Sequence, residues 1–142
     1  MKVVINGCFG GFGLSYKGVM EYAKRKGITL YAFTDKRDEL GNINFRLKNN
    51  YVQVNEEDKN AFFLHYSTKP LIDGAYEDGS YFSERDIDRD DPALIETVEA
   101  LGDDVNGRFA KLKVIEIPDG VRWQIDDYDG NESIHEVHSS WS

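Results

Sequence analysis

The sequence is poor in cysteine and has no long hydrophobic run, and both features restrict where the protein works. Cys8 is the single cysteine, so no disulfide can form within the chain, which is typical of a reducing compartment. No segment approaches the roughly 18 consecutive apolar residues that span a membrane. The apolar stretch at residues 3–5 is too short for a signal peptide. We therefore expect a cytoplasmic protein without a membrane partner.

Positive charge is also in deficit. The 26 Asp and Glu residues outnumber the 17 Lys and Arg residues, which leaves a formal net charge of -9. Such a surface repels DNA, RNA and anionic lipid at long range, so we expect no DNA or RNA partner. A small anionic ligand is compatible with this charge only where basic side chains cluster locally; elsewhere the charge serves solubility.

Hydrophobic residues make up 40% of the 142 residues, which is enough for a single domain with one sizeable core. Capping residues predict two main α-helices, one between Ser15 and Gly27 and one between Asp91 and Gly102. Runs of β-branched and aromatic residues predict strands at residues 3–5, 29–34, 51–54, 61–66, 113–117 and 121–125. The order of these elements predicts an α+β fold with a largely antiparallel β-sheet, in a single ligand-binding domain over residues 1–142.

The connections between these elements carry further predictions. The polar segment 35–50 is rich in turn residues and is expected to be a loop. Turn residues 118–120 separate the last two predicted strands, which indicates a β-hairpin. Further on, Ile134, Val137 and Trp141 recur at helical spacing, but this stretch is short and polar.

Four glycines between residues 7 and 13 follow the first predicted strand and precede the first helix, where a phosphate-binding loop would lie. The details of known phosphate loops are missing. Tyr16 stands where a dinucleotide-binding fingerprint that begins at Gly11 needs glycine, and the Gly-Lys-Ser/Thr triplet is absent. We therefore interpret the segment as a tight backbone turn, with Phe9 and Phe12 buried or in contact with another subunit.

Few side chains have the spacing of a catalytic or metal-binding motif. His135 and His138 are three residues apart, which would place both on one helical face, but without a nearby cysteine they make a weak zinc motif. His65 lies in a predicted strand and is interpreted as a structural residue. The Gly-x-Ser-x-Gly elbow is absent, and Cys8 has no recognisable catalytic context. We therefore predict no catalytic residue, no metal and no cofactor.

The segment at residues 80–91 combines aromatic and cationic side chains just before the second predicted helix. Tyr81 and Phe82 offer a stacking face, and Arg85 and Arg89 offer planar donors suited to phosphate. The N-terminus of the helix adds a favourable dipole.

A further arginine and aromatic residue, Arg108 and Phe109, follow the second helix. Base stacking combined with arginine–phosphate contacts is the chemistry of nucleotide binding, and it needs no catalytic group. The alternative interpretation is a salt-bridged surface loop beside an aromatic core residue.

Four segments of the chain resemble a family of small bacteriophage proteins: VVINGCFGGFGLS at residues 3–15, YFSERDI at 81–87, DDPAL at 90–94 and EIPDGV at 116–121. The likeness covers most of the chain, and its most specific part is the glycine–phenylalanine loop. The family is similar to the first-described phage anti-Thoeris proteins. Those proteins are sponges that sequester a cyclic ADP-ribose signal made by bacterial TIR-domain enzymes.

The resemblance implies an immune-evasion protein that binds the signal without cleaving it, as a homo-oligomer of six chains in the infected bacterial host. The ligand pocket would lie near the second helix, between subunits. The family's aromatic contact falls on Tyr81 or Phe82, its polar contact on Asp91 and its arginine on Arg108. Asp91 departs from the family, in which we expect an amide at this position. A carboxylate beside a pyrophosphate is favourable only if it meets a ribose hydroxyl.

Some members of that family also hold cyclic oligonucleotides at a second, basic site. Lys24, Arg25 and Lys26 form the one compact basic cluster in the sequence and are the candidates for this site. A helix C-terminus explains them as well, since basic side chains are favourable at the negative end of the helix dipole.

Two other classes of function are compatible with the sequence. The many carboxylates leave open a hydrolase of nucleotide derivatives, although abundance does not show that any of them converge. The net charge of -9 leaves open an acidic mimic that blocks a nucleic-acid-binding protein of the host. The interspersed basic residues make the surface less uniform than mimicry requires.

Overall fold

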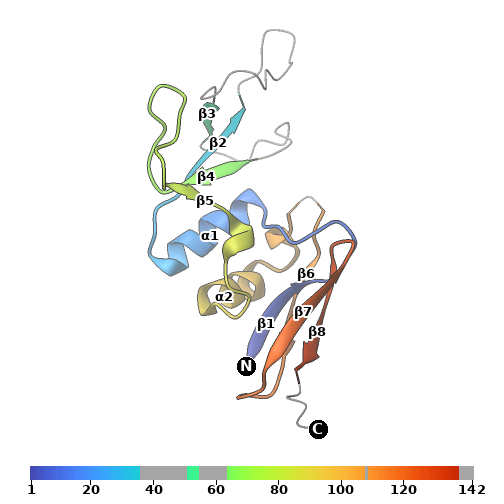
Figure 1. Cartoon of the computed structure of the whole chain (residues 1–142). Coiled ribbons are helices and arrows are strands. Elements are labelled where there is room, and N and C mark those ends of the chain that lie inside the picture. The colour runs from blue at the N-terminus through green and yellow to red at the C-terminus, as the bar shows by residue number, and fades with distance from the viewer. Residues whose placement is uncertain (36–50, 55–63, 108, 138–142) are drawn as a thin grey trace. The chain divides into compact units, whose positions relative to one another are not determined.

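The computed structural model describes residues 1–35, 51–54, 64–107 and 109–137 (Figure 1). The chain divides into two compact units, one made of Met1–Lys26 and Glu84–Ser142 and the other of Gly27–Ser83. Among the described residues there are two α-helices and eight strands, and every strand pairing is antiparallel. The predicted α+β class with two main helices is confirmed. The strands, however, form three sheets and not one.

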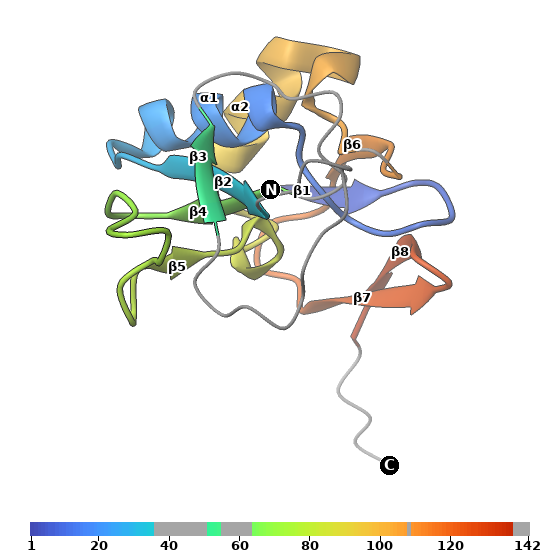
Figure 2. The same ribbon diagram turned by 90° about the horizontal axis from the view of Figure 1, so that it is seen from above.

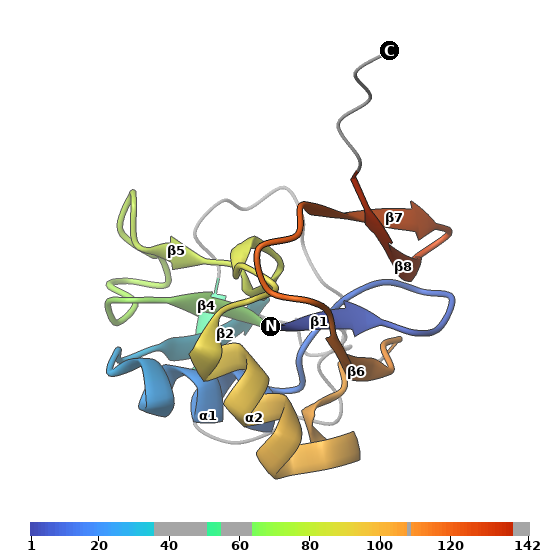
Figure 3. The same ribbon diagram turned by 90° about the horizontal axis from the view of Figure 1, so that it is seen from below.

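The first unit contains both α-helices and two two-stranded sheets. Its elements are β1 (Lys2–Asn6), α1 (Tyr16–Lys26), the 3-10 helix η1 (Glu84–Asp86), α2 (Pro92–Leu101), the 3-10 helix η2 (Gly102–Val105), β6 (Leu112–Glu116), β7 (Trp123–Tyr128) and β8 (Asn131–Glu136). Figures 2 and 3 show these elements as layers, with the two helices on one side, β1 and β6 in the middle and β7 and β8 on the other side. The apolar side chains of β1 and the buried face of α2 make the core of this unit, where Val3, Val4 and Leu94 are fully buried.

Both helices begin and end as their capping residues predict. The Ser15 hydroxyl accepts a hydrogen bond from the Gly18 N–H at 3.0 Å, at the start of α1. The Asp91 carboxylate accepts one from the Ala93 N–H at 2.9 Å, with Pro92 in the first turn of α2. Gly27 follows α1 with a φ of 79°, a left-handed conformation that glycine adopts without strain.

The second unit is built on a four-stranded sheet in the order β3-β2-β4-β5. Its strands are β2 (Tyr31–Asp35), β3 (Tyr51–Val54), β4 (His65–Ser67) and β5 (Tyr81–Phe82). The strand predicted at 51–54 has the predicted bounds, whereas β2 begins two residues later than predicted. Residues 36–50, which include most of the predicted loop, and residues 61–63 of the fourth predicted strand lie outside the described residues.

The predicted hairpin around residues 118–120 is wrong. Strand β6 pairs with β1, with Val114 opposite Val4, and β7 pairs with β8, with Ile134 opposite Ile125. The helical spacing of apolar residues near the end of the chain does not correspond to a helix, because Asn131–Glu136 is strand β8.

Two features of the structure explain these strand pairings. The apolar β1 takes β6 as its partner, and the Ile117 N–H donates to the Met1 carbonyl at 2.8 Å where that ladder ends. Between β7 and β8, Asp129 and Gly130 have φ values of 51° and 87°, as a two-residue hairpin turn requires when its twist matches that of the strands. An Asp-Gly pair between alternating sequences is a strong hairpin signal, and it outweighs the helical spacing of three apolar residues.

The described part of the chain contains no helix that is both long enough and apolar enough to cross a membrane.

Candidate ligand-binding site

Five aromatic side chains of the second unit pack together, and we call them the aromatic cluster: Phe33, Tyr51, His65, Tyr76 and Tyr81. Phe33 is fully buried at its centre. The centroid of the Phe33 ring lies between 4.9 and 6.5 Å from those of the other four rings. Its four neighbours carry three phenol hydroxyls and one imidazole, so the cluster has an apolar centre and a polar rim.

The four polar rings form a closed circuit around Phe33. Their centroids are 5.8 Å apart for Tyr51 and His65, 6.0 Å for His65 and Tyr81, 5.4 Å for Tyr81 and Tyr76, and 5.9 Å for Tyr76 and Tyr51. These separations and the tilted or edge-on arrangements are those that aromatic pairs favour. The exposed side of this circuit is a preformed aromatic surface.

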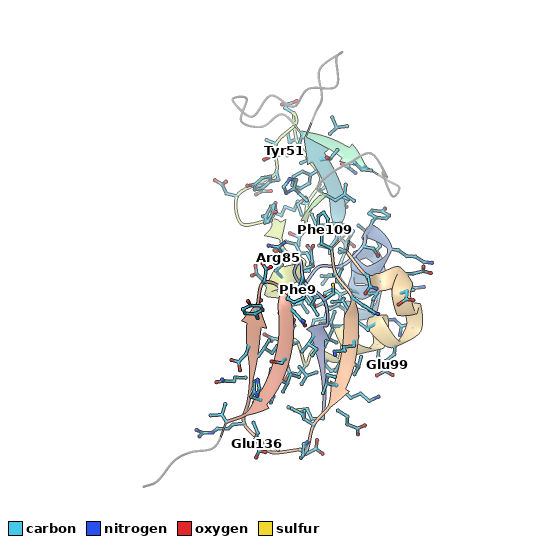
Figure 4. The ribbon with its side chains drawn as sticks, turned by 90° about the vertical axis from the view of Figure 1, so that its right-hand side faces the viewer. Phe9, Tyr51, Arg85, Glu99, Phe109 and Glu136 are labelled. Carbon is cyan, nitrogen blue, oxygen red and sulfur yellow. The ribbon has the colours of Figure 1, made fainter. Side chains whose placement is uncertain are left out.

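Strand register brings most of the cluster onto one face of the sheet. Phe33 on β2 lies directly opposite His65 on β4, and Ser67 lies opposite Tyr81 on β5. Since side chains alternate between faces, Phe33, His65 and Tyr81 share a face. Tyr51, labelled in Figure 4, enters from β3. Its N–H donates to the Gly74 carbonyl at 3.0 Å, which fastens the turn that precedes Tyr76.

Tyr81 and Phe82 point to opposite faces of the sheet, because they are neighbours in one strand. Tyr81 joins the aromatic cluster with 48% of its surface exposed. Phe82 is half-buried opposite the buried Tyr66 on the other face. Only one of the two rings can therefore contribute to a given stacking site, and Tyr81 is the one in the cluster.

The cationic residues of the predicted site belong to the first unit. Arg85, labelled in Figure 4, is exposed on η1, and Arg108 lies outside the described residues. Tyr81 and Phe82 belong to the second unit. The convergence of these aromatic and guanidinium groups on one ligand therefore stays a prediction.

Asp91 has a structural role, of which the sequence predicted the helix cap but not the contacts with α1. Besides the Ala93 N–H, its carboxylate accepts hydrogen bonds from the Tyr22 hydroxyl at 2.8 Å and from Lys26 Nζ at 3.0 Å. Burial tends to raise the pKa of the Asp91 carboxyl, but the hydrogen bonds from Lys26, Tyr22 and the Ala93 N–H bring that pKa below its ordinary value. The pKa of Tyr22 is raised well above its ordinary value by burial and then by Asp91. This carboxylate joins α1 to α2, and its contact with a ligand stays a prediction.

The basic cluster at the end of α1 is largely compensated by acidic neighbours. Arg25 Nε lies 3.0 Å from Glu21 and Arg25 Nη1 lies 3.6 Å from Glu96, while Lys26 is paired with Asp91. Lys24 is exposed in the same turn. The geometry thus favours the helix-terminus interpretation of these residues, and the second, oligonucleotide-binding site stays a prediction.

The glycine-rich segment is a bent loop that leads from β1 to α1, and none of the backbone hydrogen bonds described for it closes the predicted tight turn within it. Gly10 and Gly11 have φ values of 133° and 138°, which few other residues adopt, and the Gly10 N–H donates to the Asp129 carbonyl at 3.1 Å. Phe12 is buried as predicted, whereas Phe9 is 62% exposed and meets Tyr128 edge-on at 6.3 Å. A contact of Phe9 with another subunit stays a prediction.

The sequence suggested Arg89 as a hydrogen-bond donor to a phosphate. In the structure, Arg89 is instead paired with a residue of the first unit, Glu132. Its guanidinium donates to both carboxylate oxygens of Glu132, at 2.6 and 2.9 Å, and lies 3.7 Å from the centroid of the Phe12 ring. Glu132 also accepts the Asn6 N–H at 2.8 Å. Sequence reasoning missed this buried pair because its members are 43 residues apart and no local signal links them.

One group of described residues has the composition of a catalytic triad without its geometry. Ser133 Oγ and Asp126 Oδ2 lie 3.1 and 3.0 Å from the same atom, His135 Nε2. In a catalytic triad the histidine takes the serine proton on one ring nitrogen while the carboxylate orients the ring through the other, so two partners on the same nitrogen do not form that arrangement.

The weak zinc motif of His135 and His138 required both residues on one helical face. His135 lies on strand β8 and not on a helix, and His138 lies outside the described residues. In the ranges that the structure describes, no three His, Cys, Asp or Glu side chains gather closely enough to hold a metal ion.

Comparison of the chain with protein-family models, with curated proteins and with solved structures found no match, so the site rests on its own geometry.

Proposed function

We propose that the chain binds a cyclic ADP-ribose-type second messenger and holds it without cleaving it, as a phage immune-evasion protein in the cytoplasm of an infected bacterium. The observation that carries this proposal is the exposed Tyr81 ring on the aromatic cluster. A nucleotide base needs a rigid ring on which to stack, and the buried Phe33 supports Tyr81 from the interior of the unit.

The energetics of stacking suit a sponge. Each base stacked on an aromatic side chain contributes about 1–3 kcal/mol, and each 1.4 kcal/mol is about tenfold in affinity. The circuit of ring contacts orders Tyr81 before the ligand arrives, so less side-chain entropy is lost on binding. The same surface offers phenol and imidazole groups to the polar edge of a base.

The phosphates of such a ligand need cationic partners on a chain whose net charge is -9. The Arg85 side chain is exposed, whereas Arg89 is only 17% exposed beside Glu132, so Arg85 is the better candidate of the two on accessibility. The resemblance to the anti-Thoeris sponges adds Arg108. It also implies a homo-oligomer of six chains, in which the pocket is completed between subunits.

Calorimetric titration with cyclic ADP-ribose isomers, and with cyclic oligonucleotides for the second site, tests the proposal. We expect one ADP-ribose isomer to bind, and Tyr81→Ala to weaken that binding about 5- to 150-fold through loss of stacking. Tyr128→Ala is the matched control, because it removes a tyrosine of the first unit that is 77% exposed. This variant should bind the ligand with the affinity of the wild type. Equal affinity of the wild type and Tyr81→Ala would remove the site assignment.

Recovery of the ligand separates a sponge from an enzyme. Heat denaturation of the complex should release an intact molecule, identified by its mass, even when excess ligand has been incubated with little protein. A cleaved product under these conditions would place the chain among the hydrolases. Absence of any binding, together with co-purification of a basic host protein, would favour the acidic mimic.

A further inference from the structure

His65 and Tyr81 are joined by a hydrogen bond at the rim of the aromatic cluster. The Tyr81 hydroxyl lies 3.1 Å from His65 Nδ1, and the two ring centroids are 6.0 Å apart. The His65 ring is itself fixed by stacking on the buried Phe33, with ring centroids 5.4 Å apart and an interplanar angle of 23°. The imidazole is therefore a fixed point beside an exposed ring.

Tyr81 is the ring of the cluster whose orientation depends most on such a contact. It lies on β5, a two-residue strand at the edge of the sheet, and it is the most exposed member of the cluster, at 48%. An exposed aromatic side chain at a short edge strand can rotate about its side-chain bonds. The hydrogen bond restricts the position of the hydroxyl, and the contact with Tyr76 at 5.4 Å restricts the ring.

We propose that His65 is a positioning residue, which holds the Tyr81 ring in the orientation that stacks the base of the nucleotide ligand. This inference rests on the proposed function of Tyr81. Either tautomer of the neutral imidazole can maintain the bond, since Nδ1 can accept from the phenol or donate to its oxygen. Ordering one side chain in advance raises affinity because that entropy is no longer lost on binding.

The first test uses the protein without ligand. Biosynthetic 3-fluorotyrosine gives each tyrosine a fluorine NMR signal, and the Tyr81 signal is assigned by its loss in Tyr81→Phe. We expect this signal to become narrower in His65→Phe, because a ring that lacks the hydrogen bond rotates more freely. His65→Asn should restore the wild-type width, because its amide can reach the position of Nδ1. An unchanged width in His65→Phe would overturn the inference whatever the protein binds.

The second test is a double-mutant cycle on ligand affinity. His65→Phe keeps an aromatic ring on Phe33, and Tyr81→Phe keeps the stacking ring; each removes the same hydrogen bond. We expect each single variant to bind about three- to tenfold more weakly than the wild type. The double variant should be no weaker than either single one, because the shared bond is already absent. Fully additive losses would show that His65 acts independently of Tyr81 and would overturn the inference.

The two tests separate this inference from the proposed function. A wild-type protein that shows the fluorine effect but binds no cyclic ADP-ribose isomer would contradict the function and leave the positioning of Tyr81 established. A wild-type protein that binds with a Tyr81-dependent affinity, but shows neither effect, would contradict the positioning role alone. Circular dichroism of each variant checks that the fold is retained. Tyr81→Phe probes the same bond from a surface residue if His65→Phe does not fold.

Discussion

At the scale of single residues, several charged side chains that look available for a ligand are occupied within the fold. Arg89 is held by Glu132 and Phe12, and Asp91 by three donors. The Ala93 N–H is a local partner that the helix cap predicts, whereas Glu132, Tyr22 and Lys26 are far away in the sequence. A charged residue next to a predicted site therefore supports ligand binding only when its own partners leave it accessible, as they do for Arg85, which is exposed.

We predict that Asp91→Ala lowers the free energy of unfolding by about 2 kcal/mol or more, since it removes a helix cap and leaves the Tyr22 hydroxyl without this acceptor. Asp91→Asn should cost less, because its amide oxygen can still cap α2. Urea denaturation measures both values. Equal stability of Asp91→Ala and the wild type would contradict the role assigned to this carboxylate.

The same residue predicts a pH dependence. The pKa of Asp91 is lower in the folded chain than its ordinary value of 3.8, so the unfolded chain takes up a proton first as the pH falls. The stability that the carboxylate contributes is complete above the pKa of the unfolded state and is lost as the pH falls through the lower pKa of the folded state. The difference in stability between the wild type and Asp91→Asn should therefore shrink below about pH 4.

At the scale of elements, close contact between two turns organises one end of the first unit. A Cβ atom on Gly130 would lie 2.5 Å from Gly10 C and Gly11 N, so the turn between β7 and β8 packs backbone to backbone on the glycine-rich segment. Phe9 and Phe109, both labelled in Figure 4, flank this region, with Phe109 against Gly10. The glycines thus serve close approach, which is a different use from holding a phosphate.

We predict that Gly130→Ala lowers the free energy of unfolding by about 2–4 kcal/mol, through backbone strain at a φ of 87° together with the clash. Gly120→Ala is the matched control. Gly120 has a φ of 78° but no atom within 4 Å of an added Cβ, so the control should cost only about 1–2 kcal/mol. Urea denaturation of both variants isolates the contribution of the clash, and equal losses would contradict it.

At the scale of the whole molecule, the residues predicted as ligand contacts are divided between two compact units, each described by itself. The aromatic cluster belongs to Gly27–Ser83, whereas Arg85 and both α-helices belong to the other unit. The single ligand-binding domain over residues 1–142 stays a prediction, and so does the assembly of six chains that the resemblance implies.

Native mass spectrometry tests that assembly directly. We expect a species whose mass is six times that of the 16.2 kDa chain, and we expect the ligand-bound sample to give the same stoichiometry. The reason is that a pocket completed between subunits requires the assembly to exist when the ligand is held. A monomer in both samples would contradict the assembly of six chains that the resemblance implies. The role of Tyr81 in binding would still be tested by the titration of Tyr81→Ala.

Local signals in the sequence determined the elements whose causes are local. Caps and runs of β-forming residues act within a few residues, so both helices and the strand at 51–54 were predicted correctly. The Asp129-Gly130 turn is a local signal of the same kind, and no hairpin was predicted from it.

The tertiary structure alone decided what depends on distant partners. Three features join segments that are far apart in the sequence: the pairing of β1 with β6, the Arg89–Glu132 ion pair and the closed circuit of rings around Phe33. Tyr81 was predicted as an aromatic contact, but its partners Tyr51, His65 and Tyr76 were not, because strand register and the turn after Ile72 bring them together. Such contacts arise from burial and pairing across the chain, which no short sequence pattern encodes.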